Sequence, residues 1–379
     1  MAPIDLTHAP YGDLAIVAMR GCEEIAKQVD YYLMQWRGTP EEKSFVINAS
    51  CPRFGTGEAK GVFKHSARGL DAYIICDCFN YSVTYNMYGK EVPMSPDDHY
   101  QDLKRIIAAM GGKARRVNVI MPMLYEGRQH RRTTRESMDC AMMLQELMNM
   151  GVTNFITFDA HDPRVNNAIP LGGFDNVQAT YQMIKALLRS VPDIKLDPEN
   201  TMIVSPDEGG MGRCIYYSSV LGLDLGMFYK RRNYAVVIDG KNPIEAHEYL
   251  GRSVEGKDVI VVDDMISSGD SILDVSAQLK AKGARRVFLF VTFGLFVSGP
   301  GVFDRAYEQG LFDKVFTTNL TYTDPEILAR PWHESVNMCK YVAYIIDTLN
   351  HDSSISTLLN PVQKIHNLLD AQNAKFTNN

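Results

Sequence analysis

Two adjacent carboxylates end a run of aliphatic residues in the segment VIVVDDMISSGDS, which spans Val259 to Ser271. The turn after Asp263 and Asp264 contains three serines and a glycine, so its backbone N–H groups and hydroxyls could surround a phosphate. The two carboxylates could at the same time accept hydrogen bonds from neighbouring hydroxyls of a sugar. These residue types and their spacing predict a pocket for a ribose 5-phosphate group. The plainer alternative is a strand followed by a capped helix, but two adjacent acids exceed what a cap needs.

Such a pocket requires strands whose carboxyl ends meet at one edge of a sheet, next to helix N-termini. Short aliphatic runs alternate with longer amphipathic segments along this chain, and the helical patterns Ser137–Gly151 and Ser271–Gly283 each end in glycine. This alternation is typical of βαβ units and predicts an α/β protein with parallel sheets flanked by helices. The predicted strands are SFVINAS, DAYIICDCF, RVNVIMPM, NFITFDA, TMIVSPD, YAVVID, DVIVVDD and RRVFLFVTF.

The composition limits the classes of protein to consider. With 379 residues, 45% hydrophobic and 22% charged, the chain is long enough for two domains, and IPLGGFDNV (Ile169–Val177) is the predicted linker. A net charge of −6 gives no general attraction for nucleic acid or anionic membrane. The seven cysteines have no paired spacing, and the longest apolar run, Val287–Val297, is too short to span a bilayer. We therefore expect a cytoplasmic protein with neither nucleic acid nor membrane as partner.

Several further motifs follow one another in a definite order. They are CPRFGTGE, GRQHRRTTRES, ITFDAHDP, IVSPDEGG, YKRRN and FVSGPGVFDR. Together with the acid-serine segment, the series resembles the ribose-phosphate diphosphokinase family from about Gly12 to Leu359. The resemblance implies two phosphoribosyltransferase-like domains, each with a mostly parallel sheet flanked by helices. Their expected bounds are 1–173, joined by a C-terminal helix at 327–350, and 174–326, followed by a tail at 351–379.

The activity that the resemblance implies is transfer of the diphosphoryl group of ATP to the anomeric hydroxyl of ribose 5-phosphate, which gives phosphoribosyl diphosphate and AMP. A crowded, negatively charged phosphorus must be attacked, so the site must neutralise charge and align the reactants. The implied cofactor is Mg²⁺. The implied partners are ATP and ribose 5-phosphate, together with further copies of the chain in a dimer-based homo-oligomer, commonly a hexamer.

The resemblance also assigns roles to particular residues. It implies His161 and Asp207 as metal ligands, and Mg²⁺ takes few protein ligands, so two contributors suffice. It implies Lys230 and Arg232 as catalytic cations that stabilise the transferring group. The implied ATP contacts are Phe54, Glu58, Arg128 and Gln129. The implied ribose-phosphate contacts are Asp263, Asp264, Ser267, Ser268, Gly269 and Ser271.

Four positions depart from the pattern that the resemblance leads us to expect. Serine replaces an acid at Ser267, Asp270 replaces a glycine, and Thr56 and His130 each replace an aspartate. Two alternatives therefore stay open: a weak or inactive paralogue that regulates a true synthase, or a nucleobase phosphoribosyltransferase. The lysine and arginine of the YKRRN motif argue against the first, and two α/β halves argue against the second. Detection of AMP or of a nucleoside product would separate these cases.

Overall fold

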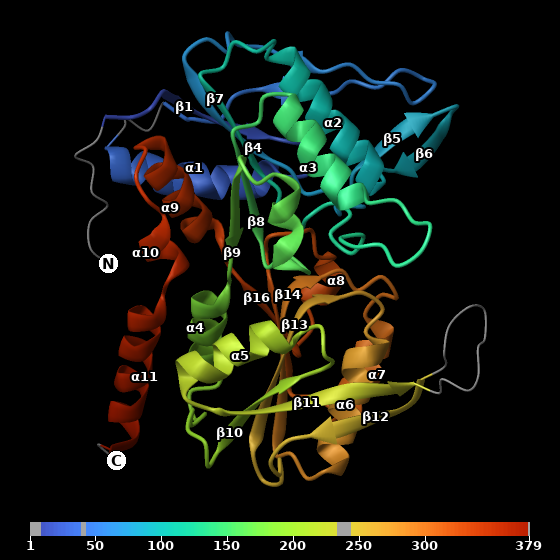
Figure 1. Cartoon of the computed structure of the whole chain (residues 1–379), viewed down its shortest axis with the longest axis vertical. Coiled ribbons are helices and arrows are strands. Elements are labelled where there is room, and N and C mark those ends of the chain that lie inside the picture. Colours follow the sequence, from blue (N-terminus) through green and yellow to red (C-terminus); the bar gives the residue numbers. More distant parts are fainter. Residues whose placement is uncertain (1–8, 39–42, 233–243, 378–379) are drawn as a thin grey trace. The chain divides into compact units, whose positions relative to one another are not determined.

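The chain forms two compact units, each with its own sheet (Figure 1). The computed structural model describes residues 9–38, 43–232 and 244–377, without the side chains of 230–232, 244–247 and 375–377. The first unit comprises Met1–Gln178, Asn319–Tyr322 and Asn337–Asn360. The second unit comprises Ala179–Thr318, Thr323–Val336 and Pro361–Asn379.

The first unit is built on a sheet of five parallel strands in the order β1-β4-β7-β8-β9. The strands are β1 (Asp13–Ala18), β4 (Leu70–Ile75), β7 (Arg116–Ile120), β8 (Asn154–Phe158) and β9 (Gly173–Val177). Every residue of β4 is buried, which explains its nearly continuous apolar sequence. Two short antiparallel pairs stand apart from the sheet: β2 (Ala49–Ser50) with β3 (Val62–Phe63), and β5 (Thr84–Met87) with β6 (Lys90–Pro93).

The helices of the first unit cover this sheet. They are α1 (Glu23–Arg37), α2 (Pro96–Ala109), α3 (Asp139–Asn149), the 3₁₀ helix η1 (Pro163–Ala168), α9 (Cys339–Asn350) and α10 (Ser356–Leu359). Helices α2 and α3 lie side by side (Figure 1), and Tyr100 and Lys104 of α2 both donate hydrogen bonds to Glu146 of α3. Helix α2 begins with a capping box formed by Ser95 and Asp98.

A buried polar network attaches α9 to the sheet. Arg116 of β7 donates two hydrogen bonds to the fully buried carboxylate of Asp71 on β4, at 2.8 and 2.7 Å, and a third to the carbonyl oxygen of Leu349. Asn350 also donates to Asp71. This network places a segment from the C-terminal part of the chain beside strands from its N-terminal part.

The second unit is built on a sheet of seven strands in the order β12-β11-β10-β13-β14-β15-β16. Only the β11–β12 pair is antiparallel among the pairs within this sheet that the structure describes. The strands are β10 (Thr201–Ser205), β11 (Asp224–Arg232), β12 (Ile244–Leu250), β13 (Asp258–Ile266), β14 (Arg286–Gly294), β15 (Lys314–Thr318) and β16 (His333–Val336). The central strands are buried on both faces, so their sequences are mostly apolar.

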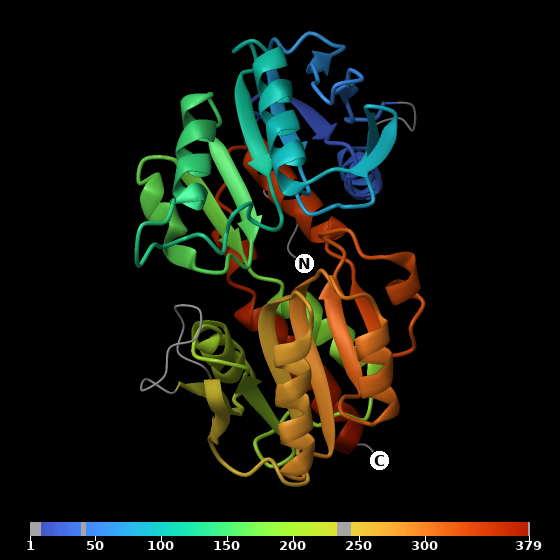
Figure 2. The same cartoon turned by 90° about the vertical axis from the view of Figure 1, so that its right-hand side faces the viewer.

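Helices lie on both faces of the second sheet. Helices α4 and α5 lie on one face, and α6 and α7 lie on the other, which is turned to the viewer in Figure 2. The bounds are α4 (Thr180–Ser190), α5 (Met211–Leu221), α6 (Asp270–Ala281), α7 (Gly301–Glu308), α8 (Pro325–Leu328) and α11 (Val362–Thr377). Helix α11 packs against α4 and α5. No helix in the described part of the chain is both long enough and apolar enough to cross a membrane.

The structure corrects two of the predicted elements. The predicted linker is wrong for its second half, because Gly173–Val177 is β9, the edge strand of the first sheet. The predicted strand SFVINAS is reduced to β2 and to an isolated bridge between Val46 and Ile16. The predicted strand YAVVID lies outside the described residues. The fold class, an α/β protein with mostly parallel sheets flanked by helices, is confirmed.

Candidate functional site

In the second unit, the candidate residues gather where the strand order reverses. Strand β10 is followed along the chain by β11 on one side of it, and β13 then pairs with β10 on its other side. The carboxyl ends of β10 and β13 therefore lie next to each other at a topological switch point, where open α/β sheets bind ligands. Asp207 follows β10, and the acid-serine segment occupies the end of β13 and the turn into α6.

The two carboxylates of the acid pair, Asp263 and Asp264, differ in solvent exposure. The Asp263 side chain is 26% exposed, whereas Asp264 is buried. The Asp264 backbone N–H donates to Asp263 Oδ1 at 2.9 Å, which fixes the two residues relative to each other. Burial and the neighbouring Asp264 carboxylate raise the pKa of Asp263 well above its ordinary value. Arg213 of α5 opposes this shift, with its Nη1 at 3.9 Å from Asp263 Oδ1.

The turn between β13 and α6 has the form of an anion site. Helix α6 begins at Asp270, so the backbone N–H groups of its first turn are available at the helix N-terminus. Gly269 has a φ of 97°, and a Cβ at this position would lie 2.5 Å from the ring of Phe303. Only glycine fits both conditions. The Ser267 carbonyl oxygen accepts a hydrogen bond from the N–H of Val297, which attaches the turn to the segment that follows β14.

The serine hydroxyls of this turn differ in their surroundings. Ser268 Oγ donates to Asp270 Oδ2 at 2.9 Å, and Asp270 itself is exposed at the first position of α6. Ser271, at the second position of α6, has an exposed side chain. Ser267 is half-buried. The residues that the sequence analysis assigned to ribose phosphate therefore follow one another from the end of β13, through the turn, into the first turn of α6.

Asp207 stands in a tight loop between β10 and α5. Its Oδ1 accepts hydrogen bonds from the N–H groups of Gly209 and Gly210, at 2.9 and 3.2 Å. Its carbonyl oxygen accepts a hydrogen bond from Ser205 Oγ. A Cβ at Gly210 would lie 2.9 Å from Ser205 Oγ, so the glycine lets the loop fold closely over the strand end. The loop fixes the Asp207 carboxylate at the same edge of the sheet as the acid pair.

Lys230 and Arg232 lie at the end of β11, the strand that pairs with β10. Strand β11 continues past the last residue that pairs with β10 and pairs there with β12 instead. The two side chains lie outside the described residues, so their role stays a prediction.

In the first unit, two histidines meet at the ends of neighbouring strands. His161 follows β8 and His130 follows β7, and the centroids of the two rings are 5.4 Å apart. His130 Nε2 lies 3.4 Å from Asp162 Oδ2. Arg164 donates hydrogen bonds to the same carboxylate, and these bonds lower the pKa of Asp162 to about 2. The ionised Asp162 therefore holds the His130 ring beside His161.

Arg128 and Gln129 belong to the loop after β7. Arg128 is exposed. Gln129 Nε2 donates to the carbonyl oxygens of Arg131 and Ser137, at 3.3 and 2.8 Å. The Gln129 side chain therefore holds the shape of the long loop that leads into α3.

Phe54 and Glu58 lie in a separate loop that packs against α2. The Phe54 N–H donates to the Glu58 carbonyl oxygen at 2.7 Å, and Thr56 Oγ1 donates to Glu58 Oε2 at 2.9 Å. Arg53 anchors the loop through Asp102 of α2, with 2.9 Å between Nη2 and Oδ2. The Phe54 ring is 53% exposed, so the loop presents a flat apolar surface beside a carboxylate.

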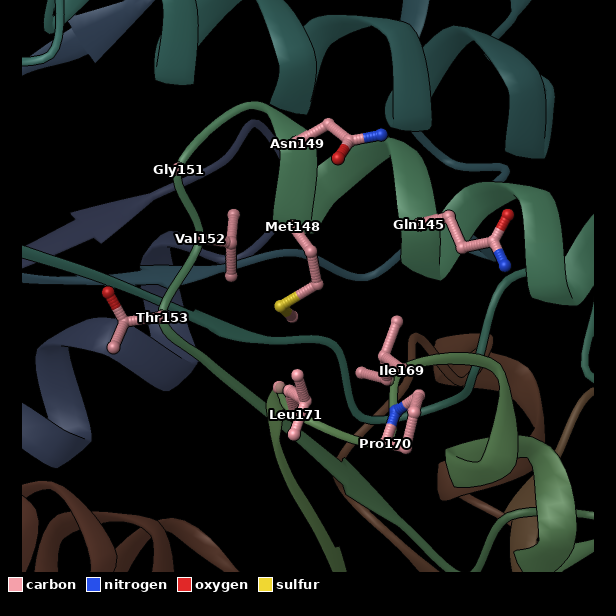
Figure 3. Close-up of a pocket in the computed structure, with 10 residues that line it drawn as sticks. Gln145, Met148, Asn149, Gly151, Val152, Thr153, Ile169, Pro170 and Leu171 are labelled. Carbon is pink, nitrogen blue, oxygen red and sulfur yellow. The ribbon is translucent and has the colours of Figure 1, made fainter.

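A hollow in the first unit lies away from these loops. It has a volume of about 680 Å³ and lies between the end of α3 and the segment before β9 (Figure 3). Val152 and Thr153, which precede β8, form part of its wall, while His161 follows the other end of β8. The hollow therefore lies at the amino ends of the strands, opposite the predicted chemistry.

The donor set fits a hard cation with few protein ligands. In the described ranges, no three His, Cys, Asp or Glu side chains cluster closely enough to hold a metal ion by themselves. Mg²⁺ commonly keeps several waters and phosphate oxygens and takes only one or two protein carboxylates. The Asp207 carboxylate, which two backbone N–H groups orient, suits such a role.

Sequence reasoning missed Arg213. Its guanidinium pairs with Asp263, yet the residue stands far from Asp263 in the sequence, in the first turn of α5. In the sequence, only the glycine pair of SPDEGG indicates that the residues after it lie near the candidate site. A helix that begins after two glycines at a strand end points its first turn along the same edge of the sheet as the neighbouring strand end.

Comparison with family models assigns both halves of the chain. Residues 14–151 match the N-terminal domain of ribose phosphate pyrophosphokinase. Residues 174–320 match the phosphoribosyl transferase domain. These two ranges contain all the candidate residues except His161, which lies between them.

Comparison with curated proteins and solved structures agrees with this assignment. The chain is 28% identical over 317 residues to a ribose-phosphate pyrophosphokinase of Vibrio parahaemolyticus, covering 83% of this chain and 91% of that protein. It is 26% identical over 359 residues to the one of Chlorobaculum tepidum, covering 93% and 98%. The fold is similar to that of phosphoribosylpyrophosphate synthetase from Mycobacterium smegmatis, with a TM-score of 0.72 at 21% identity over 90% of this chain and 100% of that one. The chain belongs to the ribose-phosphate pyrophosphokinase family.

Proposed function

We infer that this protein is a ribose-phosphate diphosphokinase, which makes phosphoribosyl diphosphate and AMP from ATP and ribose 5-phosphate. The observation that carries the inference is the position of the acid-serine segment at the switch point of a phosphoribosyltransferase-like sheet. The N-terminal domain match adds the half of the chain that a nucleobase phosphoribosyltransferase does not need. The reaction breaks the bond between the β-phosphorus of ATP and the oxygen that it shares with the α-phosphorus. The anomeric oxygen forms the new bond to phosphorus and loses its proton.

For ribose 5-phosphate, the proposed contacts come from β13 and α6. The Asp263 and Asp264 side chains accept hydrogen bonds from the sugar hydroxyls, and these bonds are stronger when the more open Asp263 is ionised. Arg213 favours that ionised form. The phosphate binds at the N-terminus of α6, where backbone N–H groups and the Ser271 hydroxyl face it. The positive end of the helix dipole adds to the attraction for the phosphate.

For ATP, the proposed contacts are Phe54 and Glu58 at the base and Arg128 and Gln129 at the phosphates. The exposed Phe54 ring can stack on adenine, and Glu58 can accept a hydrogen bond from the adenine amino group. Arg128 is exposed and can offer its planar donor fork to phosphate oxygens.

His161 and Asp207 are each proposed to contact Mg²⁺. When bound, Mg²⁺ neutralises charge on the phosphate oxygens and helps to align them for attack. The Asp207 loop holds its carboxylate in place through the two glycine N–H groups, and Asp162 holds His130 against the ring of His161. These contacts orient the Asp207 carboxylate and place the His130 ring beside His161.

Lys230 and Arg232 are proposed to stabilise the charge on the transferring diphosphoryl group. A phosphoryl transfer gains most of its acceleration from positioning and charge stabilisation, so loss of one such cation acts on turnover. We expect Lys230→Ala to lower kcat with little change in the affinity for ribose 5-phosphate. Equal losses in both would contradict this role.

The test is a phosphorus NMR time course of the purified protein with Mg²⁺, ATP and ribose 5-phosphate, run beside Lys230→Ala. We expect the wild type to form AMP and phosphoribosyl diphosphate together. Lys230→Ala should form them far more slowly or not at all. No turnover by a wild type that binds ribose 5-phosphate would refute the proposed activity and favour a regulatory paralogue. In a parallel sample, a nucleoside monophosphate made from added phosphoribosyl diphosphate and a nucleobase, with no AMP formed from ATP and ribose 5-phosphate, would refute it in favour of a nucleobase phosphoribosyltransferase.

A further inference from the structure

The β5–β6 hairpin carries an exposed tyrosine at a position that disfavours tyrosine. The register pairs Met87 with Lys90, so the turn consists of Tyr88 and Gly89. Both residues have positive φ, 50° and 75°. Such a turn favours Asn-Gly or Gly-Gly, because glycine has no Cβ and the short polar side chain of asparagine tolerates positive φ, whereas most other residues are strained there. Asn86 Oδ1 accepts a hydrogen bond from the Gly89 N–H and helps to hold the turn.

The hairpin is fixed to the loop that carries Phe54. The Tyr88 N–H donates to the carbonyl oxygen of Gly55, the residue after Phe54, at 2.8 Å. The Arg53 guanidinium lies over the ring of Tyr85 on β5, 4.6 Å from its centroid. The two segments also fit closely, because a Cβ at Gly57 would lie 2.8 Å from the sulfur of Met87.

Two exposed aromatic rings therefore belong to one locally fixed structure. Phe54 is 53% exposed and Tyr88 is 76% exposed, and a single backbone hydrogen bond joins Tyr88 to the neighbour of Phe54. Glu58 and Thr56 supply polar groups to the same loop. An aromatic ring that is neither buried nor favoured by its turn gains nothing for folding, which points to a role in binding.

We propose that Tyr88 is a second aromatic contact for the base of the nucleotide donor, and that it favours a purine over a pyrimidine. The proposal rests on the proposed function, which makes Phe54 a base contact. Stacking on a ring depends on the area of the base that is covered, so a two-ring purine gains more than a one-ring pyrimidine. The hairpin would thereby contribute to the choice of donor even though Thr56 replaces the acid that the family resemblance leads us to expect at that position.

The test compares Tyr88→Asn with Tyr88→Phe. Asparagine suits the turn and removes the ring, so the variant is expected to fold at least as well as the wild type, whereas phenylalanine keeps the ring. Tyr31→Ala, at an exposed tyrosine of α1, is the matched control for loss of a surface tyrosine. The dissociation constants of ATP, CTP and ribose 5-phosphate are measured by calorimetry on the full chain with Mg²⁺, together with KM and kcat.

We expect Tyr88→Asn to weaken ATP binding by about 5- to 150-fold, the range for loss of one stacking contact, and to reduce the ratio of ATP affinity to CTP affinity. Its affinity for ribose 5-phosphate and its kcat should stay within about twofold of the wild type. Tyr88→Phe and Tyr31→Ala should bind ATP as the wild type does.

Unchanged ATP affinity in Tyr88→Asn would overturn the proposal. An altered oligomeric state of Tyr88→Asn, measured by light scattering, with unchanged ATP affinity would overturn it in favour of a contact between copies of the chain. If the wild type binds ATP but makes no phosphoribosyl diphosphate, the proposed function fails, and the affinities still decide the role of Tyr88.

Discussion

Removal of the Arg213 charge tests whether an ionised Asp263 is needed for ribose 5-phosphate. The change is Arg213→Met, which keeps much of the length of the side chain and removes its charge. Burial and Asp264 already raise the pKa of Asp263, and Arg213 is the neighbouring group that lowers it. Without Arg213, the pKa of Asp263 is higher still, so a larger fraction of Asp263 is protonated at any given pH at which it titrates. A protonated carboxyl group loses the charge-assisted hydrogen bonds that the sugar hydroxyls are proposed to make.

The magnitude follows from the distance and the exposure of the two groups. Two unit charges 4 Å apart interact by about 1 kcal/mol in water and by about 4 kcal/mol at an effective dielectric constant of about 20. Arg213 Nη1 and Asp263 Oδ1 are 3.9 Å apart, and the side chains are 10% and 26% exposed, so an intermediate value applies. A loss of about 2 kcal/mol corresponds to ribose 5-phosphate binding that is roughly 30-fold weaker at neutral pH.

The assay is calorimetry of ribose 5-phosphate binding between pH 6 and pH 9, with Arg213→Lys as the control that keeps the charge. The defect of Arg213→Met should be largest at the acidic end and should shrink as pH rises, because Asp263 ionises at high pH even without Arg213. Arg213→Lys should bind within a few-fold of the wild type at every pH. A defect of the same size at every pH would refute the electrostatic reasoning, and so would an unchanged affinity.

Three predictions concern stability. Burial raises the pKa of Asp77 from 3.8 to about 6, so the wild type should lose up to about 3 kcal/mol of unfolding free energy relative to Asp77→Asn as pH rises from 4 to 7. If denaturant titrations showed the same difference in unfolding free energy between the wild type and Asp77→Asn at every pH in that range, the reasoning would be wrong. Arg116→Met leaves its buried carboxylate partner on β4 uncompensated and should cost about 3–5 kcal/mol in urea unfolding, and a cost below about 1 kcal/mol would contradict a buried ion pair. Gly269→Ala should lower the melting temperature more than Gly310→Ala, because both have positive φ but only the first would bring a Cβ against Phe303; equal shifts would contradict the clash.

The strands that hold the site could be predicted because they are buried on both faces. Strands β10, β13 and β14 are mostly apolar, and the carboxylates near the end of β13 are conspicuous in such a run. Strand β9 was missed because it lies at the edge of its sheet, where four of its five residues are only half-buried and its sequence begins with glycine. An edge strand therefore lacks the apolar run that identifies a central one.

Contacts between distant segments could not be predicted from local residue types. Arg213 faces Asp263 because β10 and β13 are neighbours, and Tyr88 meets Gly55 because the hairpin packs on a loop far from it in the sequence. Each of these residues looks like an ordinary surface residue in the sequence alone. The pairing of strands and the folding of loops assign them to the candidate sites.

The structure also gives physical reasons for two of the departures from the family pattern. Asp270 is the first residue of α6, where the helix dipole stabilises a negative charge, and it accepts a hydrogen bond from Ser268. His130 stands where the resemblance leads us to expect an acid, but its ring lies 3.4 Å from the ionised Asp162. An acid is therefore still present beside His161, supplied by the loop after β8 instead of the loop after β7. An imidazole and a carboxylate therefore both lie beside the proposed metal ligand, and Arg164 offsets the charge of that carboxylate.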